Sequence, residues 1–207
     1  MWRPRVGLWI GATVALLGPG ASARAADCAP EGAATRCIYR SLLPSSGLVS
    51  VCKSERDCRV GYYAGNPSDA TWLVPPPALG TLPQPQVTWL TATLAEVRLD
   101  CGHPCSVSYF FEARRRQLSE PRWSVVAVDA RRWLVAVAKD RALVVRQLFS
   151  GREVTRIERD WAPGAPIVDA ITEAHFGADG RLSFTWLRGA ERTAVSERMS
   201  VPSFARP

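Results

Sequence analysis

Two cysteines and a histidine lie close together in the motif Cys101-Gly-His-Pro-Cys105. Two thiolates and an imidazole could together hold copper or zinc, because both metals accept sulfur and imidazole ligands. Three residues separate these cysteines, whereas redox motifs and zinc knuckles place two residues between theirs. An oxidised pair would also leave no thiolate for a metal or for thiol exchange. The spacing therefore favours a disulfide-clamped turn, with His103 exposed at its tip to touch a partner.

Histidine-based catalysis has few possible centres in this chain, because His103 and His175 are its two histidines. His175 lies in an expected strand, where an ordinary strand residue is the simpler interpretation. The sequence contains no Gly-x-Ser-x-Gly elbow, no His-Glu-x-x-His zinc motif and no phosphate-binding glycine loop. We therefore predict that the protein is not an enzyme and binds no cofactor and no metal.

Acidic residues in the C-terminal third could still supply a pair of catalytic carboxylates, as in many hydrolases. No spacing singles out two of them, and exposed strand edges need such charges in any case. A hydrolase acting through carboxylates therefore stays open as an alternative. The residues concerned are Glu153, Glu158, Asp160, Asp169 and Glu173.

Three features suggest contact with a protein partner rather than catalysis. The run Arg114-Arg115-Arg116 ends an expected strand and could bind phosphate or carboxylate groups, although a solvated turn explains it too. Trp161 lies in a proline-containing loop and is the best candidate for an exposed aromatic anchor. The turn at Ser150-Gly151 could insert into a partner's active site, although turns need such residues regardless. The predicted partner-binding residues are Trp161, Ser150, His103, Arg114 and Arg115.

The first 26 residues are typical of a secretory signal peptide. Arg3 and Arg5 precede an apolar run over residues 6–17, and Ala23-Arg24-Ala25 fits a cleavage site. A bilayer span needs about 20 apolar residues, so this run is too short for a good anchor. We predict a periplasmic or extracellular protein without stable membrane insertion; an uncleaved anchor is the alternative.

The charge of the chain is only mildly basic once this segment is removed. The formal net charge of +7 falls to +4 without Arg3, Arg5 and Arg24, because 23 basic and 19 acidic residues remain. No basic run is interleaved with stacking aromatic residues, so we expect no nucleic-acid partner.

Six cysteines remain after the signal segment, and an even count in an exported chain indicates disulfides. Six cysteines allow 15 connectivities, but hairpin geometry favours Cys52 with Cys58 and Cys101 with Cys105. Cys28 with Cys37 then follows by elimination. Each bond would contribute about 2–3 kcal/mol by restricting the unfolded chain.

Short apolar runs separated by turn signals dominate the sequence, and helical periodicity is scarce. This pattern predicts antiparallel meanders, with a proline-rich connection at residues 75–86 and one disulfide-stapled domain over residues 27–207. A domain boundary within the connection is the alternative. The expected strands are 48–52, 58–64, 71–74, 93–101, 105–113, 124–128, 133–138, 142–148, 153–158, 170–176, 181–187 and 192–201.

The segment VVAVDARRWLVAVAKDRALVVRQLFSGREVTRI, residues 125–157, resembles a β-propeller blade of the WD-repeat style. Such blades alternate apolar strands with Asp-containing turns before a Ser/Thr-Gly-Arg-Glu turn into the outer strand. Residues 170–201 are similar to a degenerate neighbouring blade, although the Trp-Asp dipeptide is missing. Blades take about 40–50 residues each, so the chain could hold about four. The resemblance implies an all-β, incomplete or irregular β-propeller; a β-sandwich is the alternative.

The exported size, the disulfides and the β fold are similar to those of immunity proteins against type VI secretion amidase effectors. This resemblance is one of class, and no functional residue carries over from it. It implies a non-catalytic periplasmic protein that binds a protein partner, as an inhibitor or immunity protein against a cell-wall hydrolase. A carboxylate-dependent envelope hydrolase and a structural or assembly factor of the cell envelope are the alternatives.

Overall fold

A computed structural model describes residues 26–77, 79–164 and 166–202. Within these residues the chain forms seventeen β-strands, the 3-10 helix η1 (Pro67–Asp69) and the short helix α1 (Ile167–Ala170). All strand pairings are antiparallel. The all-β class predicted from the alternating pattern is therefore confirmed.

The strands form four sheets that follow one another along the chain. The first contains β1 (Asp27–Glu31), β2 (Ala34–Arg40), β3 (Ser46–Ser54), β4 (Asp57–Ala64) and β5 (Thr71–Trp72). The second contains β6 (Gln86–Trp89), β7 (Leu94–Gly102), β8 (Cys105–Glu112), β9 (Gln117–Leu118) and β10 (Arg122–Trp123). The third contains β11 (Val125–Asp129), β12 (Leu134–Lys139), β13 (Ala142–Gln147) and β14 (Glu153–Glu158). The fourth contains β15 (Ile171–Phe176), β16 (Arg181–Arg188) and β17 (Thr193–Ser200).

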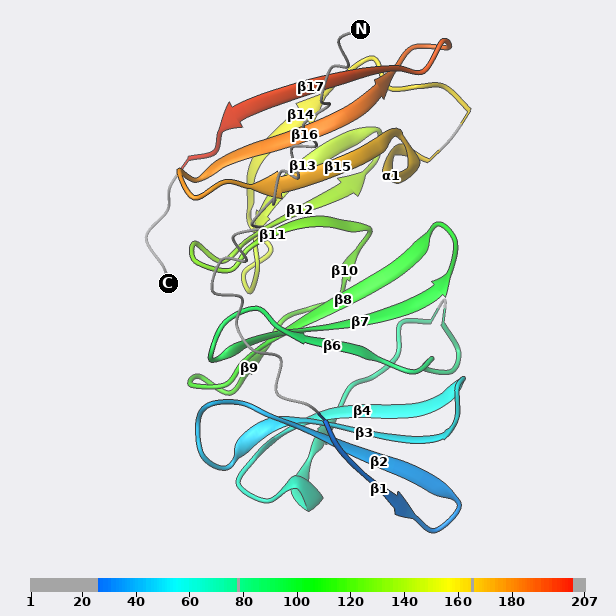
Figure 1. Cartoon of the computed structure of the whole chain (residues 1–207), viewed down its shortest axis with the longest axis vertical. Coiled ribbons are helices and arrows are strands. Elements are labelled where there is room, and N and C mark those ends of the chain that lie inside the picture. The colour runs from blue at the N-terminus through cyan, green and yellow to red at the C-terminus, as the bar shows by residue number, and fades with distance from the viewer. Residues whose placement is uncertain (1–25, 78, 165, 203–207) are drawn as a thin grey trace, which may run out of the picture.

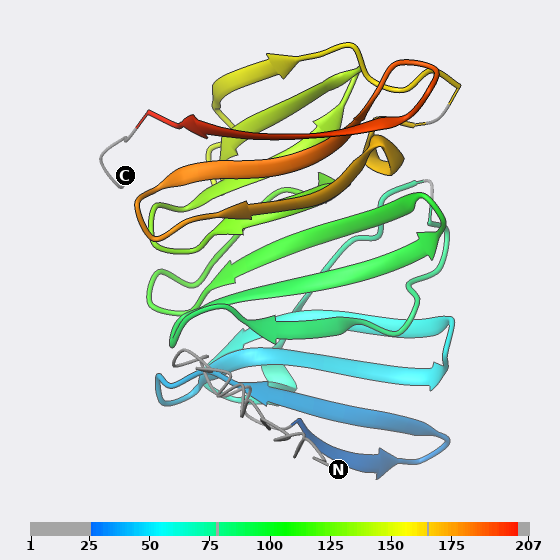
Figure 2. The same ribbon diagram turned by 45° about the horizontal axis from the view of Figure 1, so that its top comes forward.

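The four sheets are stacked along the long axis of the molecule, in chain order (Figures 1 and 2). Three hydrophobic clusters fill the three spaces between consecutive sheets. Neighbouring side chains of a strand point to opposite faces, so on β8 Phe111 enters the first cluster and Phe110 the second. None of these clusters of described residues joins the first sheet to the fourth.

Hairpin turns alternate between two opposite edges of the stack (Figure 1). We call one the arginine edge; it consists of the turns at residues 41–45, 90–93, 113–116, 130–133, 148–152 and 177–180. We call the other the clamped edge; it consists of the turns at residues 32–33, 55–56, 103–104, 140–141 and 189–192. The strands position these turns in two rows because consecutive strands of each hairpin run antiparallel across the sheet.

The three predicted disulfides are confirmed, and the described residues contain no free cysteine. Cys52 lies directly opposite Cys58 in the β3–β4 register, as Cys28 lies opposite Cys37 between β1 and β2. The Cys52–Cys58 and Cys101–Cys105 bonds close two neighbouring hairpins at the clamped edge. Both turns are thereby restricted close to their tips.

The predicted strands correspond to strands of the structure, whereas β1, β2, β6, β9 and β10 were not expected. The proline-rich segment runs from the first sheet to the second, as predicted, but it also contributes to the core. Leu82 is buried, and its carbonyl accepts a hydrogen bond from the Cys58 backbone at 3.0 Å. This backbone contact joins the connection to β4.

The outward faces of the two end sheets differ. On the first sheet, Arg36 donates to the Pro67 carbonyl at 2.7 Å, and the Arg59 guanidinium lies 4.1 Å from the Trp72 ring. The segment after β4 therefore covers this face. On the fourth sheet the outward face is polar, and the hydroxyls of Thr185 and Ser196 lie 3.0 Å apart.

None of the helices among the described residues is long and apolar enough to cross a membrane. The three disulfides fit an oxidising compartment outside the cytoplasm. The predicted signal peptide at residues 1–26 lies almost entirely outside the described residues.

Candidate functional site

The turns of the arginine edge carry a strong excess of positive charge. Their charged residues are six arginines and a single aspartate: Arg114, Arg115, Arg116, Arg131, Arg132, Arg152 and Asp179. The turns of the clamped edge are balanced, with Glu55, Asp140 and Glu191 against Arg56, Arg141 and Arg192. A charged partner would therefore distinguish the two edges, and an acidic one would prefer the arginine edge.

A groove of about 600 Å³ opens at this edge between the turns that begin the second, third and fourth sheets. Asp129 organises its floor: one carboxylate oxygen accepts the backbone N–H groups of Arg131 and Arg132, both at 2.9 Å. The other oxygen accepts Nε of Arg132 at 2.6 Å. Arg132 also donates to the carbonyls of Gly180 at 2.5 Å and Val201 at 3.3 Å. One guanidinium thus ties the third sheet to the fourth below the groove.

Replacing Arg132 with Met is expected to lower the free energy of unfolding by about 2–3 kcal/mol. The change removes the bonds to the fourth sheet and leaves the buried Asp129 carboxylate without its guanidinium. Urea denaturation of the purified protein measures the loss. Arg114→Met is the matched control, because that exposed side chain makes no hydrogen bond or ion pair within the described chain. Equal losses for the two variants would contradict the assigned tie.

Aromatic rings hold part of the arginine edge in place. The Arg115 guanidinium lies 4.8 Å from the Trp133 ring, and Trp133 packs edge-on against Phe149 at 5.1 Å. Cation–π contacts of this kind contribute about 0.5–1 kcal/mol at exposed sites. The contact joins the turn after β8 to the turn before β12, and through Phe149 to the turn after β13, so the Arg115 side chain is held within the fold.

The turn containing Ser150 is anchored from below by a buried arginine. Ser150 Oγ donates to the Gln147 side chain at 2.6 Å, and the Arg122 guanidinium donates twice to the Leu148 carbonyl, at 2.9 and 3.3 Å. Burial lowers the pKa of Arg122 from its ordinary value, an effect that Glu120 partly opposes. Three of the predicted partner-binding residues, Arg114, Arg115 and Ser150, lie in turns of the arginine edge.

His103 lies on the opposite, clamped edge. Its imidazole is largely exposed, and Nε2 lies 3.2 Å from Oδ1 of Asp169 in α1. A groove of about 390 Å³ lies beside this contact, lined also by Arg98, Asp100 and Ser106. The prediction of an exposed histidine at a clamped turn tip is confirmed in its geometry. The structure does not bring His103 together with the arginines.

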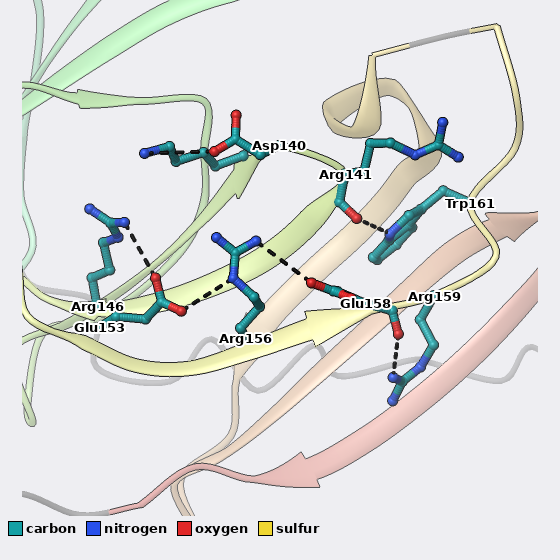
Figure 3. Close-up of polar contacts among 9 residues, drawn as sticks. Asp140, Arg141, Arg146, Glu153, Arg156, Glu158, Arg159 and Trp161 are labelled. Atoms are coloured by element: carbon teal, nitrogen blue, oxygen red, sulfur yellow. Dashed lines mark hydrogen bonds and ion pairs between the residues drawn. The ribbon is translucent and has the colours of Figure 1, made fainter.

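Trp161 is not the exposed anchor that its loop context suggested. It is 3% exposed and packs edge-on against Trp186 at a centroid distance of 5.1 Å, between the third and fourth sheets. Its indole N–H donates to the Arg141 carbonyl at 2.7 Å (Figure 3). The prediction was wrong because Trp161 pairs with Arg188 at the end of β16, and its ring lies in the core between the two sheets.

Four of the five carboxylates considered for catalysis, all except Asp160, are engaged in ion pairs. Glu153 contacts Arg146 and Arg156, and Glu158 contacts Arg156 (Figure 3). Asp169 contacts His103, and Glu173 contacts His175. The described residues contain no cluster of three or more histidine, cysteine or acidic side chains suited to a metal.

Several residues of the arginine edge were missed by sequence reasoning. Arg131, Arg132 and Arg152 lie in turns that the sequence marked only as connections. Leu42 is 58% exposed in the turn between β2 and β3, and its backbone N–H donates to the Ala92 carbonyl beside the groove. These turns could have been placed on one edge from the sequence only if the order of the strands in each sheet had been known.

Comparisons with protein families, with curated proteins and with solved structures found no match for this chain.

Proposed function

We propose that this chain is a non-catalytic, exported protein-binding protein that presents its arginine edge to an acidic surface of a partner protein. The observation that carries the proposal is the charge contrast between six arginines with one aspartate on one row of turns and a balanced opposite row. Arginine suits such a role because its fork binds carboxylates in two-point contacts. Leu42 adds an exposed apolar contact on the same edge.

The specific version is an inhibitor or immunity protein that covers the active site of a cell-wall hydrolase. The arginine-edge turns anchored by Arg122 and Asp129 support it, because a preformed surface loses little conformational entropy on binding. The four stacked meanders, each running outward from its first strand, support an incomplete propeller as the architecture that displays the turns. The alternatives, a hydrolase or an envelope assembly factor, have no specific observation in their favour.

Charge reversal on the arginine edge tests the proposal. Tagged protein with Arg114→Glu and Arg116→Glu is compared with a matched control, Arg56→Glu and Arg141→Glu, which makes the same charge change on the clamped edge. We expect the wild type and the control to retain a stoichiometric partner from the organism's own envelope extract. The arginine-edge variant should bind at least about tenfold more weakly, and the wild-type affinity should fall as salt rises above about 0.15 M.

Two results would contradict the proposal: equal retention by both variants, or release of soluble fragments when the purified protein is incubated with peptidoglycan. The immunity version has a further test. Deletion of the gene should make cells sensitive to their own siblings, and re-expression of the arginine-edge variant should fail to protect them.

A further inference from the structure

The outer edge of the fourth sheet is open over a full-length strand. β17 pairs with β16 through all eight of its residues without a register shift. On its other side no strand pairs with it within the part of the chain that the structure describes. The other three sheets have at least four strands each, so the position beside β17 is the place of a fourth strand.

The last strands of the other three sheets are protected against pairing with a further strand, whereas β17 carries one such protection, the inward-pointing Glu197 opposite Phe184. β5, β9 and β10 are two-residue strands that offer little edge. β14 has a register shift near Arg146 and a row of paired charges (Figure 3). Short strands, bulges and charges are the devices that keep sheet edges from pairing. β17 contains no proline and no lysine, and most of its residues are small.

The two charged side chains of β17 are already held within the fold. Glu197 accepts hydrogen bonds from Arg159 at 2.7 Å and from the Trp186 indole at 3.1 Å. The hydrogen bond from Arg159 lowers the pKa of the Glu197 carboxyl, so this group is ionised and engaged at neutral pH. Arg198 donates to Asp179 at 2.8 Å. A strand that docks beside β17 would therefore not have to bury two unpaired charges.

The hydrophobic core is unfinished at this edge. On β16 the inward side chains Leu182, Phe184 and Trp186 are buried. On β17, Val195 and Met199 lie opposite Trp186 and Leu182 and are only partly buried, although both pack against the same cluster, and Glu197 lies between them opposite Phe184. A further strand would cover these two side chains, and burial of apolar area contributes about 25 cal/mol per Å².

We propose that the open edge of β17 is a docking site for an extended segment of a partner protein, which adds a fourth strand to the fourth sheet. Strand addition of this kind takes its affinity from backbone hydrogen bonds and its specificity from alternate side chains. The segment would place apolar residues against Val195 and Met199, on the face that also carries the paired Glu197, and polar residues toward Ser196 and Arg198. The proposal goes beyond the arginine edge and does not depend on it.

A single strand fits this edge better than a second copy of the chain. The third sheet has four strands and the fourth has three, and Arg159 at the end of β14 reaches Glu197 on β17. β14 therefore lies beneath the vacant position. Two copies paired through β17 about a two-fold axis would bring their wider third sheets into the same space.

Amide exchange on the purified protein tests the proposal with a defined probe. The probe is a synthetic peptide, Lys-Thr-Val-Thr-Val-Thr-Val-Thr-Lys, blocked at both ends; its control carries N-methyl groups on alternate backbone amides. In the free protein, every second amide of β17 should exchange fast, because it points to the open edge. Saturating peptide should slow this set at least about tenfold, and the methylated peptide should not.

A pair of lysine variants locates the contact. Val195→Lys should raise the dissociation constant of the peptide at least about tenfold. Ser183→Lys, on the outward face of the same sheet, should leave this constant unchanged. Peptide that leaves the β17 amides unprotected would overturn the proposal. So would slow exchange of the edge amides in free protein together with a dimeric mass by light scattering, because the occupant would then be a second copy.

Discussion

Replacing Trp161 with Ala is expected to lower the free energy of unfolding by about 3–5 kcal/mol, the usual cost of emptying a buried tryptophan site. The side chain lies between the third and fourth sheets against Trp186, and its N–H bonds the Arg141 carbonyl. Its removal would leave a cavity and an unpaired carbonyl at the place where the last sheet joins the stack. Urea denaturation followed by tryptophan fluorescence and circular dichroism measures the loss.

One further variant separates packing from the hydrogen bond, and a second provides an exposed tryptophan as control. Trp161→Phe keeps an aromatic ring and should recover a large part of the loss, whereas Trp123→Ala removes a 39% exposed tryptophan and should cost less than about 1 kcal/mol. If Trp161→Ala and Trp123→Ala destabilised the protein equally, the buried position assigned to Trp161 would be untenable.

Removal of the Cys52–Cys58 bond, by Cys52→Ala with Cys58→Ala, is expected to cost about 2–5 kcal/mol. The bond closes a short hairpin turn, and Cys58 is also part of the first hydrophobic cluster. The loss therefore combines greater freedom of the unfolded chain with the lost packing of a buried sulfur. Thermal and urea unfolding of the purified variant provide the measurement.

The Cys101–Cys105 bond provides the comparison. Both of its cysteines are partly exposed and lie outside the three hydrophobic clusters, so the double Ala variant should lose less stability than the Cys52–Cys58 variant. Reducing agent should lower the stability of the wild type by more than that of either variant, because it removes all three bonds. A wild type insensitive to reduction would show that the disulfides do not contribute to folding stability.

Local features of this fold could be predicted from the sequence. Hairpins depend on alternation and on the turn residues between two neighbouring runs, so strands such as β12 and β13 and the disulfide partners Cys52 and Cys58 were found correctly. The first hairpin was missed because β1 has no regular alternation and contains Pro30. Its pairing depends on the Cys28–Cys37 bond and on β2 packing beside β3.

The candidate site could be predicted only in part, because it depends on contacts between segments far apart in the chain. Arg115 stacks on Trp133, and Arg132 reaches the Gly180 and Val201 carbonyls. Nothing in the neighbouring residues signals these contacts. The prediction for Trp161 was wrong for the same reason. Its proline-containing surroundings suggest an exposed loop, but the Trp161 ring packs against Trp186 beneath the fourth sheet.

The open stack makes each end sheet depend on a single neighbour. The first sheet has two disulfides and a covering segment after β4, whereas the fourth has neither. In quasi-linear arrays, a terminal unit with one interface opens at a lower free energy than the units inside. We therefore expect partial unfolding to start with β15, β16 and β17, so that limited digestion by a protease leaves a resistant N-terminal fragment that retains all three disulfides.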